Sequence, residues 1–493
     1  MKVEVQNLSL QEREPQIHEL VRSEGMRVGI TSSIDGGQLI TLLIDPTSGR
    51  AYLFDTPLEA ANYPCLTRRI PACHWQERIL WNMFGLVPDG HPRLKKVLLH
   101  ESYDADFFPL LSERYLSRTP LQEHQGQYQF LEVKGEGVYE IPVGPIHAGI
   151  IEPGHFRFSC FGELILNLEI RLGYVHRGIE KKLTQVDWRK GRFVAEAAAS
   201  DSAAAYALAY SECIESMFSI ELPYRAKLLR TLALEIERIG MHLADLAGIA
   251  GDIGFIGVAS SFQRIRGLTF SMAELLSGQR FLRAFICPGG VVREPTKLTL
   301  NQISSCAENL SNQCKVLLEM LLESQGVDDR LRGIGRVNLS LASDFGLVGI
   351  AGRASGLKYD VRQFRSEYET FTPAFHKLGD VLARVAVRAE EIKMSIEIIR
   401  SVLARLEIPG SSYQPLPDRL PSNSVGLSIV EAHRGELIHL AFTDEQGCIS
   451  RYCIKDPSVN NWTALAMAVR NNLVADFPLC NKSFSLAYSG HDL

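Results

Sequence analysis

The sequence predicts an α+β protein in which a small N-terminal α+β domain precedes a mainly α-helical bundle domain with small peripheral β-sheets. Three observations support this fold class. Apolar and polar residues alternate between residues 26 and 55, which is the pattern of half-buried strands. Apolar residues recur at helical spacing after residue 223. The chain of 493 residues also exceeds the roughly 300 residues at which single cores stop growing.

Composition and charge exclude several classes of protein. The net charge of -5 gives no electrostatic basis for binding nucleic acid or an anionic lipid surface. The first twenty residues are polar and acidic, unlike a secretory signal. The most apolar window, residues 202–211, ends at Glu212 and is shorter than the ~18 residues of a membrane span. We therefore expect a cytoplasmic protein that meets a membrane only through partner subunits.

The cysteine pattern argues against a metal site built by this chain alone. Ten cysteines in a chain without a secretion signal do not indicate a disulfide framework. Cys448 and Cys453 are five residues apart, and no C-x-x-C motif occurs. We expect no cofactor to be bound by this chain.

The first domain begins with a predicted antiparallel meander. Three strand-like runs, residues 26–34, 38–44 and 50–54, are separated by turns with Asp-Gly and Pro-x-x-Gly sequences. Residues 74–84 then place apolar side chains on one helical face, and Gly85 ends the pattern.

A boundary is predicted after this domain. Residues 117–136 are polar and weakly patterned, which is typical of a linker. The predicted domains are therefore residues 1–116 and 137–493.

The second domain starts with short strands and continues as a helical bundle. Strand patterns occupy residues 139–149 and parts of 155–178. Apolar stripes with charges opposite predict helices, of which the first has Pro223 in its first turn. These helical segments are residues 222–251, 261–285 and 373–410. The last sixty residues predict a hairpin followed by a helix, at residues 435–457 and 463–473.

Charged and polar residues gather around glycine-rich turns at the entry to the bundle. Polar clusters on loops held by a rigid scaffold are candidate functional sites. Helix caps and surface ion pairs would give the same spacing, so spacing leaves both interpretations open. The residues are His147, Glu152, His155, Arg157, His176, Arg177 and Glu180.

Long segments of the chain resemble a known family. From about residue 136 onward they are similar to the large subunit of group 4, energy-converting NiFe hydrogenases and to its relative, the quinone-site large subunit of respiratory complex I. These segments include GPIHAGIIEPGHFRF, LGYVHRGIEK, ELPYRAKLLRTLALEIERIGMHL, GLVGIAGRASGLKYDVRQ and VEAHRGELIHLAF. Earlier, QERILWNMFGLVPDGHPRLKKVLLHESY resembles the small complex I subunit that hydrogenases of the formate-hydrogenlyase type fuse ahead of the large one. The resemblance implies the NiFe hydrogenase/complex I large-subunit fold.

The resemblance also implies a metal site whose ligands are missing here. A NiFe hydrogenase holds its metals through two C-x-x-C pairs, because soft thiolates suit nickel and iron. Counted from matching motifs, the first pair falls on Ala199 and Ser202, within the alanine-rich run 195–213. The second pair falls on Ala487 and Gly490. All four thiolates are absent, and small side chains let neighbouring helices close over the vacated volume.

Other side chains near these positions could only partly replace the thiolates. Cys213 and Cys480 are lone thiols, which are usually small buried apolar residues. Asp201, Ser202 and His491 could offer harder donors to a different metal, which is the lesser alternative.

The resemblance to the complex I subunit implies a quinone site that is also incomplete. In that family a loop histidine and a tyrosine at the head of the first helix hold the quinone headgroup. Here His147 matches the first loop histidine, Pro153 stands near the second, and Ser200 replaces the tyrosine. Asp252 matches an acid that organises the same cavity. The candidate cavity residues are therefore His147, Ser200 and Asp252, and quinone reduction in the usual manner is not expected.

The face toward an iron-sulfur partner is retained. His176 and Arg177 match the family HRG motif beside the [4Fe-4S] cluster of the neighbouring small subunit, and His242 matches a histidine that faces that cluster. A cation near a cluster raises its reduction potential. The alternative interpretation is that Arg177 and His242 form structural ion pairs with Glu180 and Asp245, respectively.

The leading interpretation is a soluble-arm subunit of a membrane-bound redox complex, without a Ni-Fe site. It would dock an iron-sulfur small subunit with a 4Fe-4S cluster, together with a ferredoxin-like subunit and membrane antiporter-like subunits, and couple redox chemistry to ion translocation. These partners would hold it on the cytoplasmic side of the membrane. One alternative is an enzyme that reduces a quinone or another small acceptor in the remodelled cavity, and another is a structural scaffold.

Overall fold

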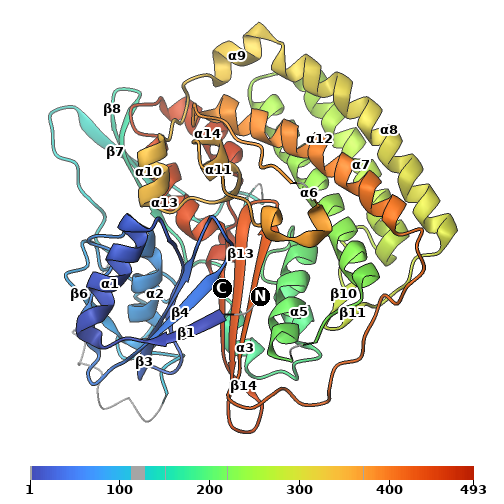
Figure 1. Cartoon of the computed structure of the whole chain (residues 1–493). Helices are drawn as coiled ribbons and strands as arrows, with labels where there is room; N and C mark the ends of the chain where they lie inside the picture. The colour runs from blue at the N-terminus through green and yellow to red at the C-terminus, as the bar shows by residue number, and fades with distance from the viewer. Residues whose placement is uncertain (1–2, 113–127, 150, 219, 370) are drawn as a thin grey trace.

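The N-terminal region lies on one side of a central C-terminal sheet and the long helices lie on the other side (Figure 1). This is a computed structural model. It describes residues 3–112, 128–149, 151–218, 220–369 and 371–493. The α+β fold class with a helical second part is confirmed.

The predicted meander forms most of the N-terminal sheet. Its strands pair in the order β1-β4-β3-β2, with β1 parallel to β4 and the other pairs antiparallel. The strands are β1 Val3–Asn7, β2 Arg27–Ser33, β3 Gln38–Ile44 and β4 Ala51–Pro57. The helices are α1 Leu10–Ser23 and α2 His74–Phe84, and the two short strands β5 Asn62–Pro64 and β6 Val87–Asp89 pair in parallel. As predicted, Gly85 ends α2, with φ 71°.

The two predicted domains share an apolar core. Side chains of β3 such as Ile40 and Leu42 belong to the same buried cluster as Ile438 and Leu440 of the C-terminal sheet. The predicted linker lies partly outside the described residues, at 117–127. Its described part is anchored, because the Tyr128 hydroxyl donates to the Glu169 carboxylate at 2.7 Å.

The strands predicted at the start of the second domain form a sheet of their own. They are β7 Val138–Val143, β8 His155–Phe161 and β9 Leu164–Arg171, paired antiparallel in this order. Two short helices, α3 Ile179–Leu183 and α4 Gly191–Glu196, and the longer helix α5 Ala203–Met217 follow and lead into the bundle.

The bundle consists of long helices with apolar stripes. They are α6 Tyr224–Asp252, α7 Ile256–Ser277, α8 Lys297–Leu322 and α12 Val381–Arg405, and all of them except α8 lie largely within segments that the sequence predicted as helical. Pro223 is the cap residue before α6, one position earlier than expected. Shorter elements lie between them: β10 Ile286–Cys287, β11 Gly290–Val291, α9 Gln325–Leu331, α10 Leu339–Asp344 and α11 Gly349–Ala354. None of the helices in the described part of the chain combines the length and apolar character needed to cross a membrane.

The predicted C-terminal hairpin belongs to a three-stranded antiparallel sheet. Its strands are β12 Val425–Ala432, β13 Gly435–Thr443 and β14 Ile449–Lys455. The sheet is followed by α13 Ser458–Ala468, α14 Phe477–Phe484 and α15 Tyr488–His491. The alanine-rich helix α5 packs directly on β12, because a Cβ at Gly426 would lie 2.3 Å from the Cys213 carbonyl oxygen. Small side chains are what permit this close approach.

Candidate functional site

Arg434, in the turn between β12 and β13, contacts both of the segments that carry the positions assigned to missing thiolates. Its Nη1 and Nη2 donate to the two carboxylate oxygens of Asp201 at 2.7 Å each, and Nη1 lies 3.3 Å from Ser202 Oγ. Its Nε donates to the Ser485 carbonyl oxygen, in the tail that leads to Ala487. One side chain therefore cross-links the segment before α5 to the C-terminal tail.

A second acid fills the space beside Gly490. A Cβ at Gly490 would lie 2.4 Å from Asp456 Oδ2 and 3.1 Å from the Ala487 Cβ. The Tyr206 hydroxyl of α5 donates to the same Asp456 oxygen at 2.6 Å. Any side chain at residue 490, a thiolate included, would require this buried carboxylate to move.

The pair between Arg434 and Asp201 is strongly charged. Burial by itself would raise the pKa of Asp201, but the Arg434 guanidinium outweighs burial and holds that pKa below its ordinary value. The carboxylate is therefore ionised at neutral pH, and both of its oxygens are occupied by the guanidinium.

The residues at the four substituted positions do not fit a nickel-iron centre. Ala199, Ala487 and Gly490 have no side-chain donor atom, and Ser202 has only a hydroxyl. Nickel and iron of low valence favour soft thiolate ligands. Within the described ranges, no three His, Cys, Asp or Glu side chains form a group that could hold a metal ion.

The two cysteines considered as substitutes are buried. Burial raises the pKa of Cys213 to about 12 and that of Cys480 to about 11. Both side chains are therefore neutral thiols at neutral pH in the metal-free protein.

Two buried imidazoles continue the polar contacts inward from residue 202. His433 Nδ1 lies 3.4 Å from Ser202 Oγ, and the His433 ring centroid is 6.5 Å from that of His242. His242 Nε2 lies 3.1 Å from a carboxylate oxygen of Glu391. Burial lowers the pKa of both histidines, so both are neutral. His433 lies within the segment VEAHRGELIHLAF, which resembles the family, but its position in the sequence does not indicate that it lies near Ser202.

Glu391 belongs to an ionic network that is buried at the centre of the bundle. Arg353 lies 2.5 Å from Glu391 and 2.7 Å from Glu431, and Arg362 lies 2.7 Å from Asp360. Removing one partner from such a network leaves an uncompensated buried charge, which is strongly destabilising. Its members are Glu235, Arg238, Arg353, Asp360, Arg362, Glu391 and Glu431.

The candidate cavity residues are not gathered around one space. His147 Nε2 lies 2.8 Å from the Gly154 carbonyl oxygen within its own loop, and Asp252 pairs with Lys482 of α14. Ser200 lines a cavity of about 20 Å³ whose lining includes neither His147 nor Asp252. This volume holds one or two water molecules. It is too small for a quinone headgroup.

The cavity at Ser200 contains an acid that the sequence did not single out. Burial raises the pKa of Glu237 to about 8, although the Ala204 and Ala205 N–H groups donate to its carboxyl oxygens. Its side chain therefore caps the start of α5, which is a structural role.

Of the residues expected to face an iron-sulfur partner, Arg177 is exposed. Its guanidinium donates to the carbonyl oxygens of Ala197 and Ala198 at 2.7 Å each, next to the substituted ligand positions. His176 is partly buried and lines an internal cavity. His242 has 0% of its side chain exposed, and its burial does not support direct contact with a neighbouring subunit.

The ion pairs considered as alternatives for these residues are not formed. Glu180, the suggested partner of Arg177, instead pairs with Arg451 at 2.8 Å. Asp245 pairs with an arginine of α12 at 2.9 Å rather than with a histidine.

Three further members of the polar cluster make structural contacts. Glu152 accepts hydrogen bonds from the N–H and the hydroxyl of Ser489, which ties the loop to the C-terminal tail. Arg157 pairs with Glu140 at 3.1 Å, and His155 Nδ1 contacts a backbone carbonyl at 3.2 Å. The contacts of these three residues therefore agree with the interpretation as surface ion pairs and structural hydrogen bonds.

Comparison with known proteins places this geometry in a family. Residues 252–418 match the model of the 49 Kd subunit of respiratory-chain NADH dehydrogenase, and residues 38–119 match that of its 30 Kd subunit. The chain is 30% identical to formate hydrogenlyase subunit 5 of Escherichia coli over 87% of this chain and 77% of that protein. It is 31% identical to hydrogenase-4 component G of the same organism, over 88% and 76%.

A solved structure agrees with the sequence matches. A chain of the membrane-bound sulfane sulfur reductase, an archaeal respiratory membrane complex, superposes with a TM-score of 0.68 at 25% identity. The match covers 73% of this chain and 99% of that chain. The chain therefore belongs to the family of hydrogenase and complex I large subunits in which a 30 kDa-type region is fused ahead of a 49 kDa-type region.

Proposed function

We propose that this chain is a peripheral subunit of a membrane-bound redox complex and carries no Ni-Fe site. In this role it docks an iron-sulfur small subunit that holds a 4Fe-4S cluster. Ferredoxin-like and membrane antiporter-like subunits complete the complex, which couples electron transfer to ion translocation. The chain lies on the cytoplasmic side of the membrane and is held there by these partners.

The observation that carries this proposal is the Arg434–Asp201 pair between the two sets of substituted positions. It links the segment before α5 to the C-terminal tail, which are the two elements that thiolate-bound metals would otherwise connect. Asp456 fills the adjacent space beside Gly490. These two elements are therefore held together by ion pairs and hydrogen bonds between protein groups. The small volume of the cavity at Ser200 favours docking over reduction of an acceptor.

Metal analysis of the intact purified complex tests the absence of the Ni-Fe site. We expect iron from the partner clusters and no stoichiometric nickel. About one nickel per copy of this chain would overturn the proposal, since no other thiolate set in the described residues could hold it.

The docking role is tested at Arg177. Arg177→Ala removes the exposed cation, so we expect a lower potential of the neighbouring cluster in an EPR-monitored redox titration, and weaker co-purification of the small subunit. Arg336→Ala, at another exposed arginine, is the matched control and leaves both unchanged. An unaltered potential in the Arg177 variant would contradict the docking role.

A further inference from the structure

A cavity of about 300 Å³ lies between the N-terminal region and the C-terminal part of the chain. The N-terminal region contributes α2 and the segments beside it, and β9, α13 and the residues around them form the rest of the wall. This volume is at the lower end of the range found for pockets that bind small molecules. The function proposed above assigns nothing to this space.

Aromatic and apolar side chains form part of the wall. Trp75 of α2, together with Trp462 and Met467 of α13, is among the residues that line the cavity. The Trp75 indole N–H already donates to Thr463 Oγ1 at 2.8 Å, so the one polar atom of this ring is occupied. Indole rings and a thioether form a surface that suits the body of an aromatic ligand.

Cationic side chains outnumber acidic ones in the same cavity. Glu169 is the one carboxylate among the described residues that line it. Glu169 pairs with Arg93 and, at 3.3 Å, with Lys95, and it accepts hydrogen bonds from the Tyr128 hydroxyl and the Leu131 N–H at 2.7 Å each. Both of its oxygens are thus occupied. The arginines that line the cavity are Arg78, Arg93 and Arg470.

Arg78 is a buried cation whose direct contacts are all with uncharged groups. It is 4% exposed, and among the described residues it forms no ion pair with a carboxylate. Its guanidinium donates to the Lys95 and Lys96 carbonyl oxygens at 2.8 and 3.3 Å, and to His74 Nε2 at 3.4 Å. Burial lowers the pKa of Arg78 only to about 10, so the group stays charged at neutral pH. Buried charges in proteins are usually paired with an opposite charge.

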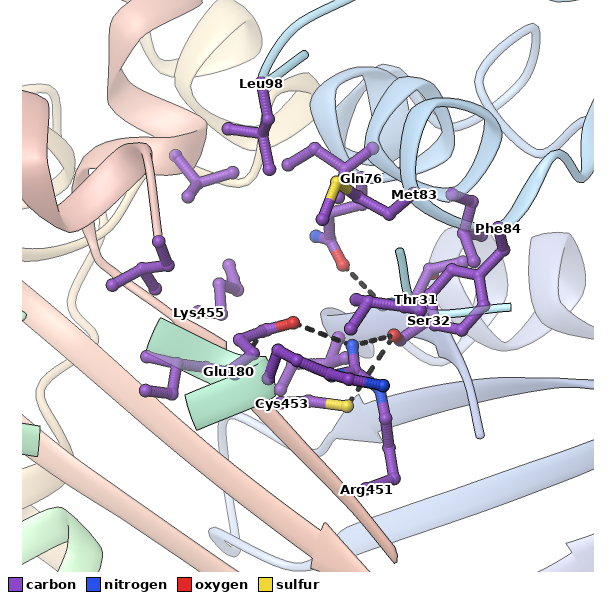
Figure 2. Close-up of a pocket in the computed structure, with 18 of the residues that line it drawn as sticks. Thr31, Ser32, Gln76, Met83, Phe84, Leu98, Glu180, Arg451, Cys453 and Lys455 are labelled. Atoms are coloured by element: carbon purple, nitrogen blue, oxygen red, sulfur yellow. Dashed lines mark hydrogen bonds and ion pairs between the residues drawn. The ribbon is translucent and has the colours of Figure 1, made fainter. Parts of the chain in front are cut away.

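A second buried arginine shows the usual arrangement. Arg451 lines a cavity on the opposite face of α2, where it lies 2.8 Å from the Glu180 carboxylate (Figure 2). No such partner is present for Arg78 in the described part of the chain. In agreement, burial and the charges of Arg78 and Arg93 lower the pKa of His74 to about 2. The wall around His74 therefore has excess positive charge.

Arg470 extends this charge to the opening of the cavity. It is exposed, and its Nη2 donates to Asn167 Oδ1 at 2.8 Å rather than to a carboxylate. Asn167 and Glu169 are two residues apart on β9, so their side chains lie on the same face, about 7 Å apart. Because Arg93 contacts Glu169, the guanidinium groups of Arg470 and Arg93 occupy neighbouring positions along one wall.

We propose that this cavity binds a small aromatic carboxylate of the benzoate class. The positive charge of Arg78 and Arg470 compensates its carboxylate, since a guanidinium suits this group in shape and charge. Its ring packs against Trp75, Trp462 and Met467, which an inorganic anion would leave uncovered. Because the wall comes from both α2 and α13, the bound acid links the two regions of the chain.

Binding of three probes to the purified full-length chain tests the proposal. Benzoate has both the ring and the charge, benzamide has the same shape without the charge, and acetate has the charge without the ring. Saturable binding is followed by ligand-observed NMR and calorimetry. We expect one benzoate per chain, bound at least about tenfold more tightly than benzamide, because charge-assisted hydrogen bonds are about twice as strong as neutral ones. Acetate should also bind at least about tenfold more weakly, since it buries no ring.

Two variants locate the site. Arg470→Gln removes the exposed cation at the opening, so the benzoate affinity should fall by about threefold while the benzamide affinity stays the same. Ala466→Trp should abolish binding of both by filling the cavity. Arg419→Gln, at an exposed arginine that does not line the cavity, is the matched control and leaves both affinities unchanged.

Several results would overturn the proposal. Equal affinities for benzoate and benzamide would show that the cavity does not select an anion, and equal affinities for benzoate and acetate would show that it does not hold a ring. No saturable binding at all would mean that the cavity contains water only. The three-probe comparison on the unmodified chain decides this even if a variant fails to fold.

Discussion

At the scale of single residues, the Asp201–Arg434 pair determines how the substituted site is held together. The Arg434 side chain is 9% exposed, and its positive charge is compensated by the carboxylate that both Nη atoms contact. A bidentate arginine–carboxylate pair is a strong and directional contact. The pair therefore links two segments whose sequence positions are more than two hundred residues apart.

Replacing this acid should destabilise the chain in a pH-dependent way. Asp201→Asn removes the charge but keeps the shape, so Arg434 is left without an anionic partner, and we expect a loss of about 2 kcal/mol at neutral pH. The folded pKa of Asp201 is lowered from 3.8. The stabilisation is thus fully present above pH 3.8 and is lost as the pH falls through the folded pKa. Urea unfolding at a series of pH values should show the variant and the unmodified chain converging in acid.

A surface pair provides the control for this prediction. Asp418 is 99% exposed and contacts Arg189 at 2.8 Å, so Asp418→Asn should change stability by less than about 0.5 kcal/mol. An effect of Asp201→Asn as small as this control would show that the pair does not hold the site.

The sequence resemblance assigns four positions to missing thiolates, but it does not predict what surrounds those positions. Ala199 and Gly490 follow from counting along matched motifs. Asp456 and His433 do not, because their importance arises from contacts with residues distant in the sequence. Whether His147, Ser200 and Asp252 line one cavity also depends on how distant segments pack, which the sequence does not reveal. In the structure they do not share a cavity.

At the scale of elements, helix α5 packs closely on β12 because one residue of that strand, Gly426, has no side chain. Gly426 of β12 approaches the backbone of α5 so closely that a Cβ would lie 2.3 Å from a carbonyl oxygen. A backbone atom does not move aside as the end of a flexible side chain would. The close contact therefore joins Gly426 of β12 to Cys213 and Met217 in the C-terminal part of α5.

Two glycine substitutions should therefore have opposite effects. Gly426→Ala forces α5 away from β12, and we expect a loss of about 3 kcal/mol. Gly267→Ala in α7 meets nothing within 4 Å, so it should gain about 0.5 to 1 kcal/mol from the better helix propensity of alanine. Denaturant midpoints measure both, and a neutral Gly426 variant would contradict the close contact.

Several elements with long apolar periodicity were predicted, whereas the long helix α8 and the shortest elements were not. The helices α6, α7 and α12 carry an apolar stripe over many turns, and the meander β2-β3-β4 has clear turns between its strands. Strand β1 was missed because it is short and largely exposed, and because its parallel partner β4 lies about fifty residues away.

At the scale of the whole molecule, the two regions predicted as separate domains form a joint core. Gly29 of β2 shows this directly, since a Cβ there would lie 3.1 Å from both Leu42 of β3 and Ile438 of β13. The pattern of apolar residues in each segment indicates that these strands are buried. It does not reveal that the N-terminal sheet packs against the C-terminal sheet.

Loosening this junction should therefore affect both regions at once. Leu42→Ala removes a fully buried side chain from the shared cluster, at a cost of about 3 kcal/mol, and hydrogen exchange measured by mass spectrometry should accelerate in β3 and also in β12 and β13. Leu66→Ala is the matched control, because Leu66 is equally buried in a cluster made only of residues from the N-terminal region. In that variant the faster exchange should stay within the N-terminal peptides. If Leu42→Ala also left β12 and β13 unchanged, the two regions would be independent folding units, and the joint core would not couple them.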